Sequence, residues 1–171
     1  MLTEAYVGLG SNLGDRGAAI AGGIAAMRRL GTGVAASSLY ETEPVGWAHQ
    51  PPFLNAACRL WTTLDGFELL AELRGVEGRA GGGKAFVNGP RGLDLDLLLF
   101  GRAVIATPGI SVPHPRMAER AFVLAPLAEL APGLVHPAIG RTVAALLAQL
   151  SQTHSPLRYG GSRFGIPSST G

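Results

Sequence analysis

The fold of this chain is decided by one stretch, Asn88-Gly89-Pro90-Arg91-Gly92-Leu93-Asp94-Leu95-Asp96-Leu97-Leu98-Leu99-Phe100. Its apolar run, 93–100, contains no glycine or proline, which predicts a buried strand. Because strand side chains alternate between two faces, Asp94 and Asp96 share one face. The same alternation predicts an opposite face made of Leu93, Leu95, Leu97 and Leu99.

Two carboxylates on one face of a buried strand repel each other. Burying them without a cation raises the pKa of one of them and costs several kcal/mol of folding free energy. A hard divalent cation, most simply Mg²⁺, held between the carboxylates and a phosphate would remove this cost. Arg91, in the turn just before the acids, suits a phosphate site because a guanidinium pairs with two oxygens at once. The alternative is an edge strand with a solvated acidic face, and the pair alone leaves it open.

The composition favours one domain over 1–150, followed by a loosely held polar tail over 151–171. The chain has 171 residues, 47% hydrophobic and 15% charged, which excludes a disordered chain. A net charge of +2 without a basic run does not indicate nucleic acid. The first residues carry Glu4 and no long apolar segment, so we expect no signal peptide and no membrane span. We expect a cytoplasmic protein, and a monomer.

The cationic residues are almost all arginines, and Lys84 is the only lysine among 14. Half of them lie in the part of the chain from Arg74 to Arg120, around the acid pair. This distribution favours phosphate binding, although a general preference for arginine in the composition explains it too. Cys58 is the only cysteine, so no disulfide can form within the chain, and its apolar surroundings predict a core residue.

The apolar pattern predicts strands over 5–9, 34–40, 53–63, 93–100 and 103–105. A first helix is expected from the spacing of Ile20, Ile24 and Met27, and a last one over 143–150. The sequence Asp65-x-x-Glu68 predicts a capping box that begins another helix. We expect its apolar stripe to consist of Phe67, Leu70, Leu73 and Val76, and a separate face to carry Arg74 and Glu77.

Three further patterns give weaker signals. The spacing Gly8-x-Gly10-x-x-x-Gly14 differs from a dinucleotide-binding motif, and we expect a tight turn instead. The glycine-rich segment 78–89 contains Lys84 but lacks the serine or threonine that follows the lysine of a P-loop. His114 stands between two prolines that restrict its backbone, so a ligand contact and a structural role are equally open.

Five short motifs, in order and at matching spacing, together resemble the 6-hydroxymethyl-7,8-dihydropterin pyrophosphokinase family. They are Gly10-Ser11-Asn12-Leu13-Gly14, Tyr40-Glu41-Thr42-Glu43-Pro44, Phe53-Leu54-Asn55-Ala56-Ala57, Gly89-Pro90-Arg91-Gly92-Leu93-Asp94-Leu95-Asp96 and Val112-Pro113-His114-Pro115-Arg116-Met117, continued by Arg120-Ala121-Phe122. The resemblance covers about residues 4–150. It implies an α+β fold, a ferredoxin-like sandwich with an antiparallel-rich sheet and packed helices.

The resemblance also implies the reaction, which moves diphosphate from ATP to the hydroxymethyl group of the pterin and releases AMP, in folate biosynthesis. Asp94 and Asp96 would hold two Mg²⁺ ions that bridge the ATP phosphates. The pterin-binding positions correspond to Thr42, Val45, Phe53, Asn55 and Phe122. The ATP-binding positions correspond to Arg74, Glu77, Arg91, His114 and Arg120. The cations expected to reach the transferred phosphates are Arg79, Lys84 and Arg91.

The chain departs from the family pattern in the loop before the aspartates, where arginines and a tryptophan are common. Those places hold Gly81, Gly83, Val87 and Asn88, and Pro115 replaces an aromatic residue common beside the histidine. Fewer phosphate contacts predict slower turnover, or weaker pterin binding, than in a typical member. Two alternatives therefore stay open: a non-catalytic relative that binds pterin or nucleotide, and a metal-dependent phosphohydrolase that uses the same acids.

Overall fold

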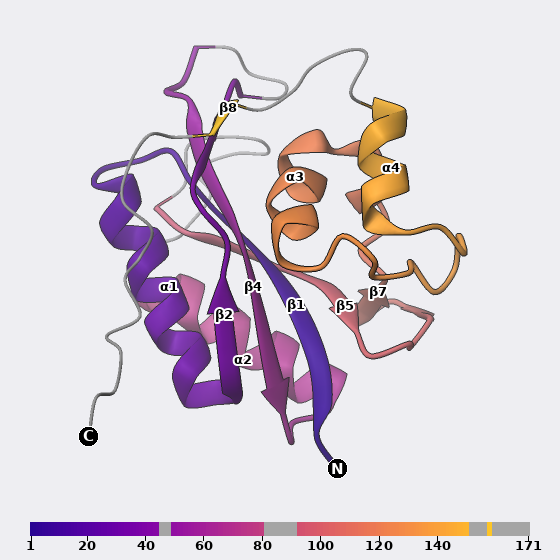
Figure 1. The fold of residues 1–171 in the computed structure, drawn as a ribbon. Coiled ribbons are helices and arrows are strands. Elements are labelled where there is room, and N and C mark those ends of the chain that lie inside the picture. The colour runs from indigo at the N-terminus through magenta and orange to yellow at the C-terminus, as the bar shows by residue number, and fades with distance from the viewer. Residues whose placement is uncertain (45–48, 81–91, 151–156, 159–171) are drawn as a thin grey trace, which may run out of the picture.

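The computed structural model describes residues 1–44, 49–80 and 92–150, and the backbone of 157–158. Figure 1 shows the elements in chain order. They are β1 (Thr3–Ser11), α1 (Arg16–Leu30), β2 (Thr32–Ala36), β3 (Tyr40–Thr42), β4 (Phe53–Thr62), α2 (Gly66–Arg79), β5 (Asp94–Phe100), β6 (Ile105–Thr107), β7 (Ile110–Val112), the 3₁₀ turn η1 (Met117–Glu119), α3 (Ala121–Leu130), α4 (Val143–Leu150) and β8 (Leu157–Arg158).

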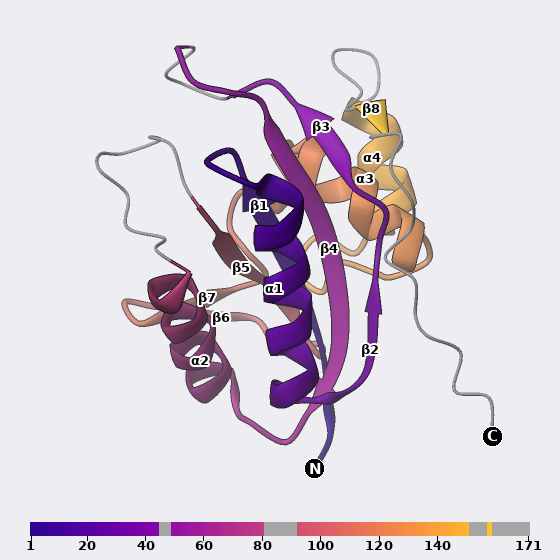
Figure 2. The ribbon, with the colours of Figure 1, turned by 90° about the vertical axis from the view of Figure 1, so that its left-hand side faces the viewer.

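The main sheet runs in the order β5-β1-β4-β3-β8, and β2 also pairs with β4. Every pairing in it is antiparallel, and β6 and β7 form a separate antiparallel hairpin. Helices α1 and α2 cover one face of the sheet, while α3 and α4 lie against the other (Figures 1 and 2). The fold is therefore α+β, with an antiparallel sheet and packed helices, as expected. The helices form a layer on each face of the sheet.

Two apolar cores result, one under each helical layer. The first joins α1 and α2 to the inward residues of β1, β4 and β5, and it contains Ile20, Ile24 and Met27 at the predicted helical spacing. The second joins α3 and α4 to Tyr6, Ala57 and other residues of the opposite sheet face. Cys58 is 0% exposed within the first core, which confirms the prediction of a core cysteine.

Within β5, the alternation of side chains between the two faces of the sheet is interrupted. Leu93, Leu95 and Leu97 belong to the first core, but Leu98 and Leu99 both belong to the second. The prediction that Leu99 shares the face of the other odd-numbered leucines was wrong, because the pairing with β1 shifts register between Tyr6 and Val7. Such a bulge adds one residue and reverses the alternation beyond it. The aspartates precede the bulge and keep their common face.

Other predicted elements differ from the structure in their bounds or in the residues that they bury. The predicted strand over 34–40 is split into β2 and β3, because the Ser37 hydroxyl takes the place of a backbone acceptor for the Ala57 N–H at 2.9 Å. The predicted strand over 103–105 is β6, two residues later. Helix α2 buries Leu69, Leu73 and Val76. Phe67, expected on this stripe, is 54% exposed.

The glycine spacing near the first strand has two separate causes. Gly14 has a φ of 65° in the turn between β1 and α1, which confirms the predicted tight turn. Gly8 and Gly10 lie within β1, where Gly8 pairs with Asp96 and Gly10 with Asp94.

Across the described residues, no helix is both long and apolar enough to cross a membrane.

Candidate active site

Two hollows in the surface meet at Asp96. The sheet hollow is lined by residues of β1, β3, β4, β5, the loop before η1 and the start of α3. Among them are Gly10, Thr42, Phe53, Asn55, Asp94, Asp96, Arg116, Arg120 and Phe122. The hairpin hollow is lined by the β6–β7 hairpin and its surroundings, among them Arg74, Asp96, Leu97, Ile110, Ser111 and His114. Asp96 lines both, so a group bound at this carboxylate can face ligands from either side.

The sheet hollow contains a fixed amide. Asn55 is 7% exposed, and its Nδ2 atom donates to the Thr42 hydroxyl at 2.8 Å. Its Oδ1 atom then lies toward β1, 3.2 Å from the place that a Cβ would take on Gly10. Because one donor is already used, the orientation of the amide is set before a ligand binds. A side chain held in this way can recognise the polar edge of a flat ring.

Aromatic rings provide the apolar surfaces of the same hollow. Phe53 comes from β4 and Phe122 from the first turn of α3, so segments far apart in the sequence bring the rings together. The Arg120 guanidinium carbon lies 5.6 Å from the centre of the Phe122 ring, within the range of a cation–π contact. The hollow thus combines flat apolar surfaces with a positive charge at one side.

Asp96 shows the electrostatic cost that the acid pair predicts. Burial, together with the negative charge of Asp94, raises the pKa of Asp96 to about 6, although Arg74 and Arg120 act in the opposite direction. A cation between the carboxylates would relieve this cost. No group of three or more His, Cys, Asp or Glu side chains able to hold a metal occurs among the described residues. The pair fits Mg²⁺, which often takes one or two carboxylates and completes its ligands with phosphate and water.

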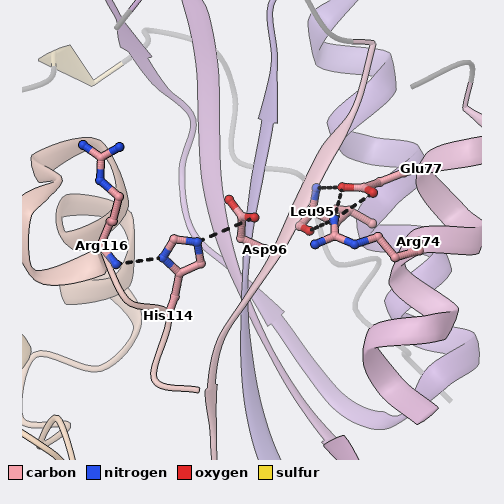
Figure 3. Close-up of polar contacts among 6 residues, drawn as sticks. All are labelled: Arg74, Glu77, Leu95, Asp96, His114 and Arg116. Carbon is pink, nitrogen blue, oxygen red and sulfur yellow. Dashed lines mark hydrogen bonds and ion pairs between the residues drawn. The ribbon is translucent and has the colours of Figure 1, made fainter. Parts of the chain in front are cut away.

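His114 faces Asp96 from the loop after β7 (Figure 3). Its Nε2 atom lies 3.9 Å from an Asp96 carboxylate oxygen, and its Nδ1 atom accepts the Arg116 N–H at 3.2 Å. Burial and the charge of Arg120 lower the pKa of His114, which favours the neutral ring. With Nδ1 used as an acceptor, the neutral ring carries its proton on Nε2, toward the acids.

Arg74 and Glu77 share a face of α2, as predicted, and form an ion pair with an N–O distance of 2.9 Å. Glu77 also accepts the Leu95 N–H at 2.7 Å, and Arg74 donates to the Leu95 carbonyl at 3.3 Å (Figure 3). Burial opposes the charge of Arg74, but its pKa is raised because Glu77, Asp96 and Asp94 outweigh that effect. Both side chains therefore hold the strand that carries the acids.

The remaining predicted residues divide into two groups. Arg79 is not in either hollow at Asp96: it lines a separate one between α1 and α2, and its guanidinium folds back over Gly75. The rest lie outside the described residues, namely Val45, Gly81, Gly83, Lys84, Val87, Asn88 and Arg91.

Sequence reasoning missed several residues of the sheet hollow, including Gly8, Gly10, Glu43 and Arg116. The two glycines become visible only through the pairing of β1 with β5, which sets them opposite the aspartates. Arg116 had a usable signal, because it stands two residues after His114 in the same proline-containing loop.

Comparison with known proteins gives one consistent result. The family model described as 7,8-dihydro-6-hydroxymethylpterin-pyrophosphokinase (HPPK) matches residues 6–132. The 2-amino-4-hydroxy-6-hydroxymethyldihydropteridine pyrophosphokinase of Bacillus subtilis is 47% identical over 128 residues, 74% of this chain and 77% of that protein. The protein of the same name from Pseudomonas aeruginosa is 44% identical over 150 residues, 86% of this chain and 92% of that one.

Other similar proteins are much longer than this chain. The folic acid synthesis protein fol1 of Pneumocystis carinii is 40% identical over 146 residues, 85% of this chain but 20% of that protein. The crystal structure of Plasmodium falciparum HPPK-DHPS wild type with pteroate has a TM-score of 0.70 at 15% identity, covering 87% of this chain and 42% of that one. At that identity the structural match supports the fold alone.

Proposed function

The chain belongs to the 7,8-dihydro-6-hydroxymethylpterin-pyrophosphokinase family, and from this premise we propose how its site transfers diphosphate from ATP to the hydroxymethyl group of 6-hydroxymethyl-7,8-dihydropterin. The products are AMP and the pterin diphosphate, in folate biosynthesis. The observation that carries the proposal is the position of Asp96, which lines both hollows. A donor in one hollow and an acceptor in the other would then meet at this carboxylate.

The pterin would occupy the sheet hollow. Phe53 and Phe122 offer flat apolar surfaces for its ring, and Asn55 offers a pre-oriented amide for its polar edge. Thr42 contributes by fixing that amide. Val45 is proposed as a further contact on the strength of the family pattern alone. Asp94 and Asp96 line the same hollow, so the hydroxymethyl group can reach the acids while the ring is held.

ATP would place its phosphates at the acid pair from the side of the hairpin hollow. Arg74 and His114 line that hollow, and Arg120 lines the neighbouring one. A neutral His114 with its proton on Nε2 can donate to a phosphate oxygen beside Asp96, and Arg120 adds positive charge. Arg91 and Lys84 are proposed as phosphate contacts from the sequence alone. Arg79 lines a different hollow and Glu77 accepts the Leu95 N–H, so their contact with ATP is proposed from the family pattern alone.

Asp94 and Asp96 would hold two Mg²⁺ ions together with the ATP phosphates. When bound, the ions neutralise the phosphate charge and favour in-line transfer. The pterin oxygen attacks the β-phosphorus, the bond to the α-phosphate oxygen breaks, and the hydroxymethyl proton passes to solvent. Such a transfer depends on positioning and charge more than on a strong base. The chain accordingly supplies two aromatic surfaces, an amide and several cations around the acids.

The strand order also supports the ferredoxin-like sandwich as the finer description of the fold. With β2 and β3 counted as one interrupted strand, the elements follow the sequence β-α-β-β-α-β. In the sheet, β5 lies next to β1, β1 next to β4, and β4 next to both β2 and β3. Each of these neighbouring pairs is antiparallel. Helices α3 and α4 would then be an addition on the second face.

The test combines the protein, Mg²⁺, ATP and the hydroxymethyl pterin, and follows nucleotides by chromatography. We expect AMP only when the pterin is present, and none from Asp96→Ala. Phosphate release without pterin would instead indicate a hydrolase, and binding without turnover would indicate a non-catalytic relative. Titration calorimetry should show weaker ATP binding in a chelator; equal binding would refute the metal role of the acids.

The departures from the family pattern in the loop before the aspartates lead to a separate expectation. We propose that Gly81 and Gly83 leave the site short of phosphate contacts and slow its turnover. Loss of one charged contact costs a few kcal/mol in the transition state, roughly a hundredfold in rate. Gly81→Arg or Gly83→Arg should then raise kcat. An unchanged or lower kcat in both variants would contradict this explanation.

A further inference from the structure

Strand β5 has an outer edge that the sheet does not protect. It pairs with β1 and stands at one end of the strand order in the described part of the chain. An edge strand exposes unpaired N–H and C=O groups, and such edges open locally more easily than inner strands. The two acids lie on this strand, so a loose edge would loosen them too.

At Leu95 the outer edge is held by side chains of α2 instead of a neighbouring strand. Glu77 accepts the Leu95 N–H at 2.7 Å, and Arg74 donates to the Leu95 carbonyl at 3.3 Å. The N–H belongs to the peptide that joins Asp94 to Leu95, and the carbonyl belongs to the peptide that joins Leu95 to Asp96. One side chain therefore fixes each peptide that connects Leu95 to an acid.

The two side chains also hold each other. Arg74 donates from one nitrogen to both Glu77 carboxylate oxygens, at 3.0 and 2.9 Å. The Glu77 side chain is 13% exposed, against 54% for Arg74, so the carboxylate is the sheltered member of the pair. Hydrogen bonds to a charged carboxylate are stronger than those between neutral groups. Glu77 therefore makes the firmer contact with β5, at 2.7 Å against 3.3 Å for Arg74.

We propose that Glu77 and Arg74 are positioning residues, which fix the peptides on both sides of Leu95 and thereby aim Asp94 and Asp96 at the phosphate-bound cation. This inference rests on the proposed function of the acid pair. It concerns only the cation and nucleotide side of the site. The aromatic and amide groups of the sheet hollow come from β4 and α3, so they do not depend on this contact.

The first measurement needs no ligand and no activity. Hydrogen exchange of the Leu95 amide, followed by NMR, should be faster in Glu77→Ala than in wild type by about tenfold or more. The Leu97 amide, on the other side of Asp96, provides an internal reference. Glu72→Ala, an exposed substitution of the same type on α2, should leave the Leu95 exchange rate unchanged.

The second measurement is binding of Mg²⁺ with α,β-methylene-ATP, an analogue in which the bond to be broken is blocked. In Glu77→Ala and Arg74→Ala we expect Kd to rise about tenfold, the effect of a modest loss of pre-organisation. Because Arg74 also lines the hollow proposed for ATP, a higher Kd supports the positioning role only together with faster exchange of the Leu95 amide. The Kd of the pterin alone should stay within about twofold of wild type. Glu77→Gln keeps an acceptor for Leu95 and should recover part of the analogue affinity.

Two results would overturn the inference. One is an unchanged analogue Kd in both alanine variants; the other is an equal loss of pterin and analogue affinity, which indicates general unfolding. If Glu77→Ala does not fold, Arg74→Ala and Glu77→Gln decide by the same criteria. Failure of the proposed function is distinguishable from failure of this inference, because in that case the wild-type protein itself forms no AMP.

Discussion

The Nε2 atom of His114 lies 3.9 Å from Oδ1 of Asp96, and the opposite ring nitrogen is already occupied by the Arg116 N–H. The imidazole is thus turned so that its Nε2 atom faces the carboxylate that the two hollows share (Figure 3). Burial lowers the pKa of His114, and the nearby Arg120 lowers it further. The ring therefore contributes a neutral donor near pH 7.5, not a positive charge.

We predict that a neutral donor can partly replace His114. His114→Gln presents an amide N–H in the same region, whereas His114→Ala presents none. At pH 8 we expect kcat/KM for ATP to fall roughly 10- to 100-fold in the alanine variant and much less in the glutamine variant. Steady-state kinetics at saturating pterin measures both. Equal losses in the two variants would show that the imidazole itself is required.

The ionisation of Asp96 should make the metal-free protein less stable at high pH. Its pKa is about 6 in the folded state, against a usual value of 3.8, because burial and Asp94 disfavour the charged form. The raised pKa stabilises the folded state fully below about pH 4, and this contribution is lost as pH rises through about 6. Asp96→Asn removes the ionisation and should therefore stabilise the metal-free protein at pH 8.

The expected gain is about 1–3 kcal/mol at pH 8 and near zero at pH 4, from the linkage between pKa and stability. Urea unfolding in the presence of a chelator measures it at both pH values. Glu72→Gln, on the exposed side of α2, controls for removal of a negative charge elsewhere. An Asp96→Asn protein no more stable than wild type at pH 8 would contradict the electrostatic interpretation.

The Cys58 thiol should not react in the folded protein. It is 0% exposed, and burial raises its pKa to about 12, so the reactive thiolate is scarce at pH 8. We expect a disulfide reagent such as DTNB to react with the native protein at least about a hundredfold more slowly than with the unfolded chain. Absorbance at 412 nm follows the reaction. Rapid native labelling would refute the assignment of Cys58 to the core.

Local signals in the sequence account for much of the fold. Asp65 and Glu68 form the predicted capping box at the start of α2, and Gly14 makes the predicted turn. Both depend on interactions within a few residues, which the sequence shows directly. The common face of Asp94 and Asp96 was equally predictable, because the alternation of side chains requires only that the strand be regular up to Asp96.

Features that depend on partners distant in sequence were not accessible. The bulge that moves Leu99 to the other face arises from the register with Tyr6 and Val7. Likewise, Ser37 interrupts a strand because its hydroxyl meets the backbone of Ala57. In the site, nothing local indicates that Glu77 bonds to the backbone of Leu95, since the two are 18 residues apart.

The last prediction concerns Gly10, which lies beside the Asn55 amide that we propose contacts the pterin. A Cβ on Gly10 would lie 3.2 Å from Asn55 Oδ1, a contact tight enough that the amide must move. Asn55 has little freedom, because it is buried and bonded to Thr42. Gly10→Ala should therefore displace the amide and raise the pterin Kd about tenfold, equivalent to ~1.4 kcal/mol.

Gly8→Ala is the matched control, because Gly8 lies in the same strand and lines the same hollow. Its Cβ would meet Leu98 side-chain atoms at 3.5 Å, an ordinary contact. We expect the pterin Kd of this variant to stay within about twofold of wild type, since a fitted methyl group does not disturb Asn55. Pterin fluorescence titration compares the two. Equal affinities in Gly10→Ala and Gly8→Ala would show that the orientation of Asn55 does not govern pterin binding.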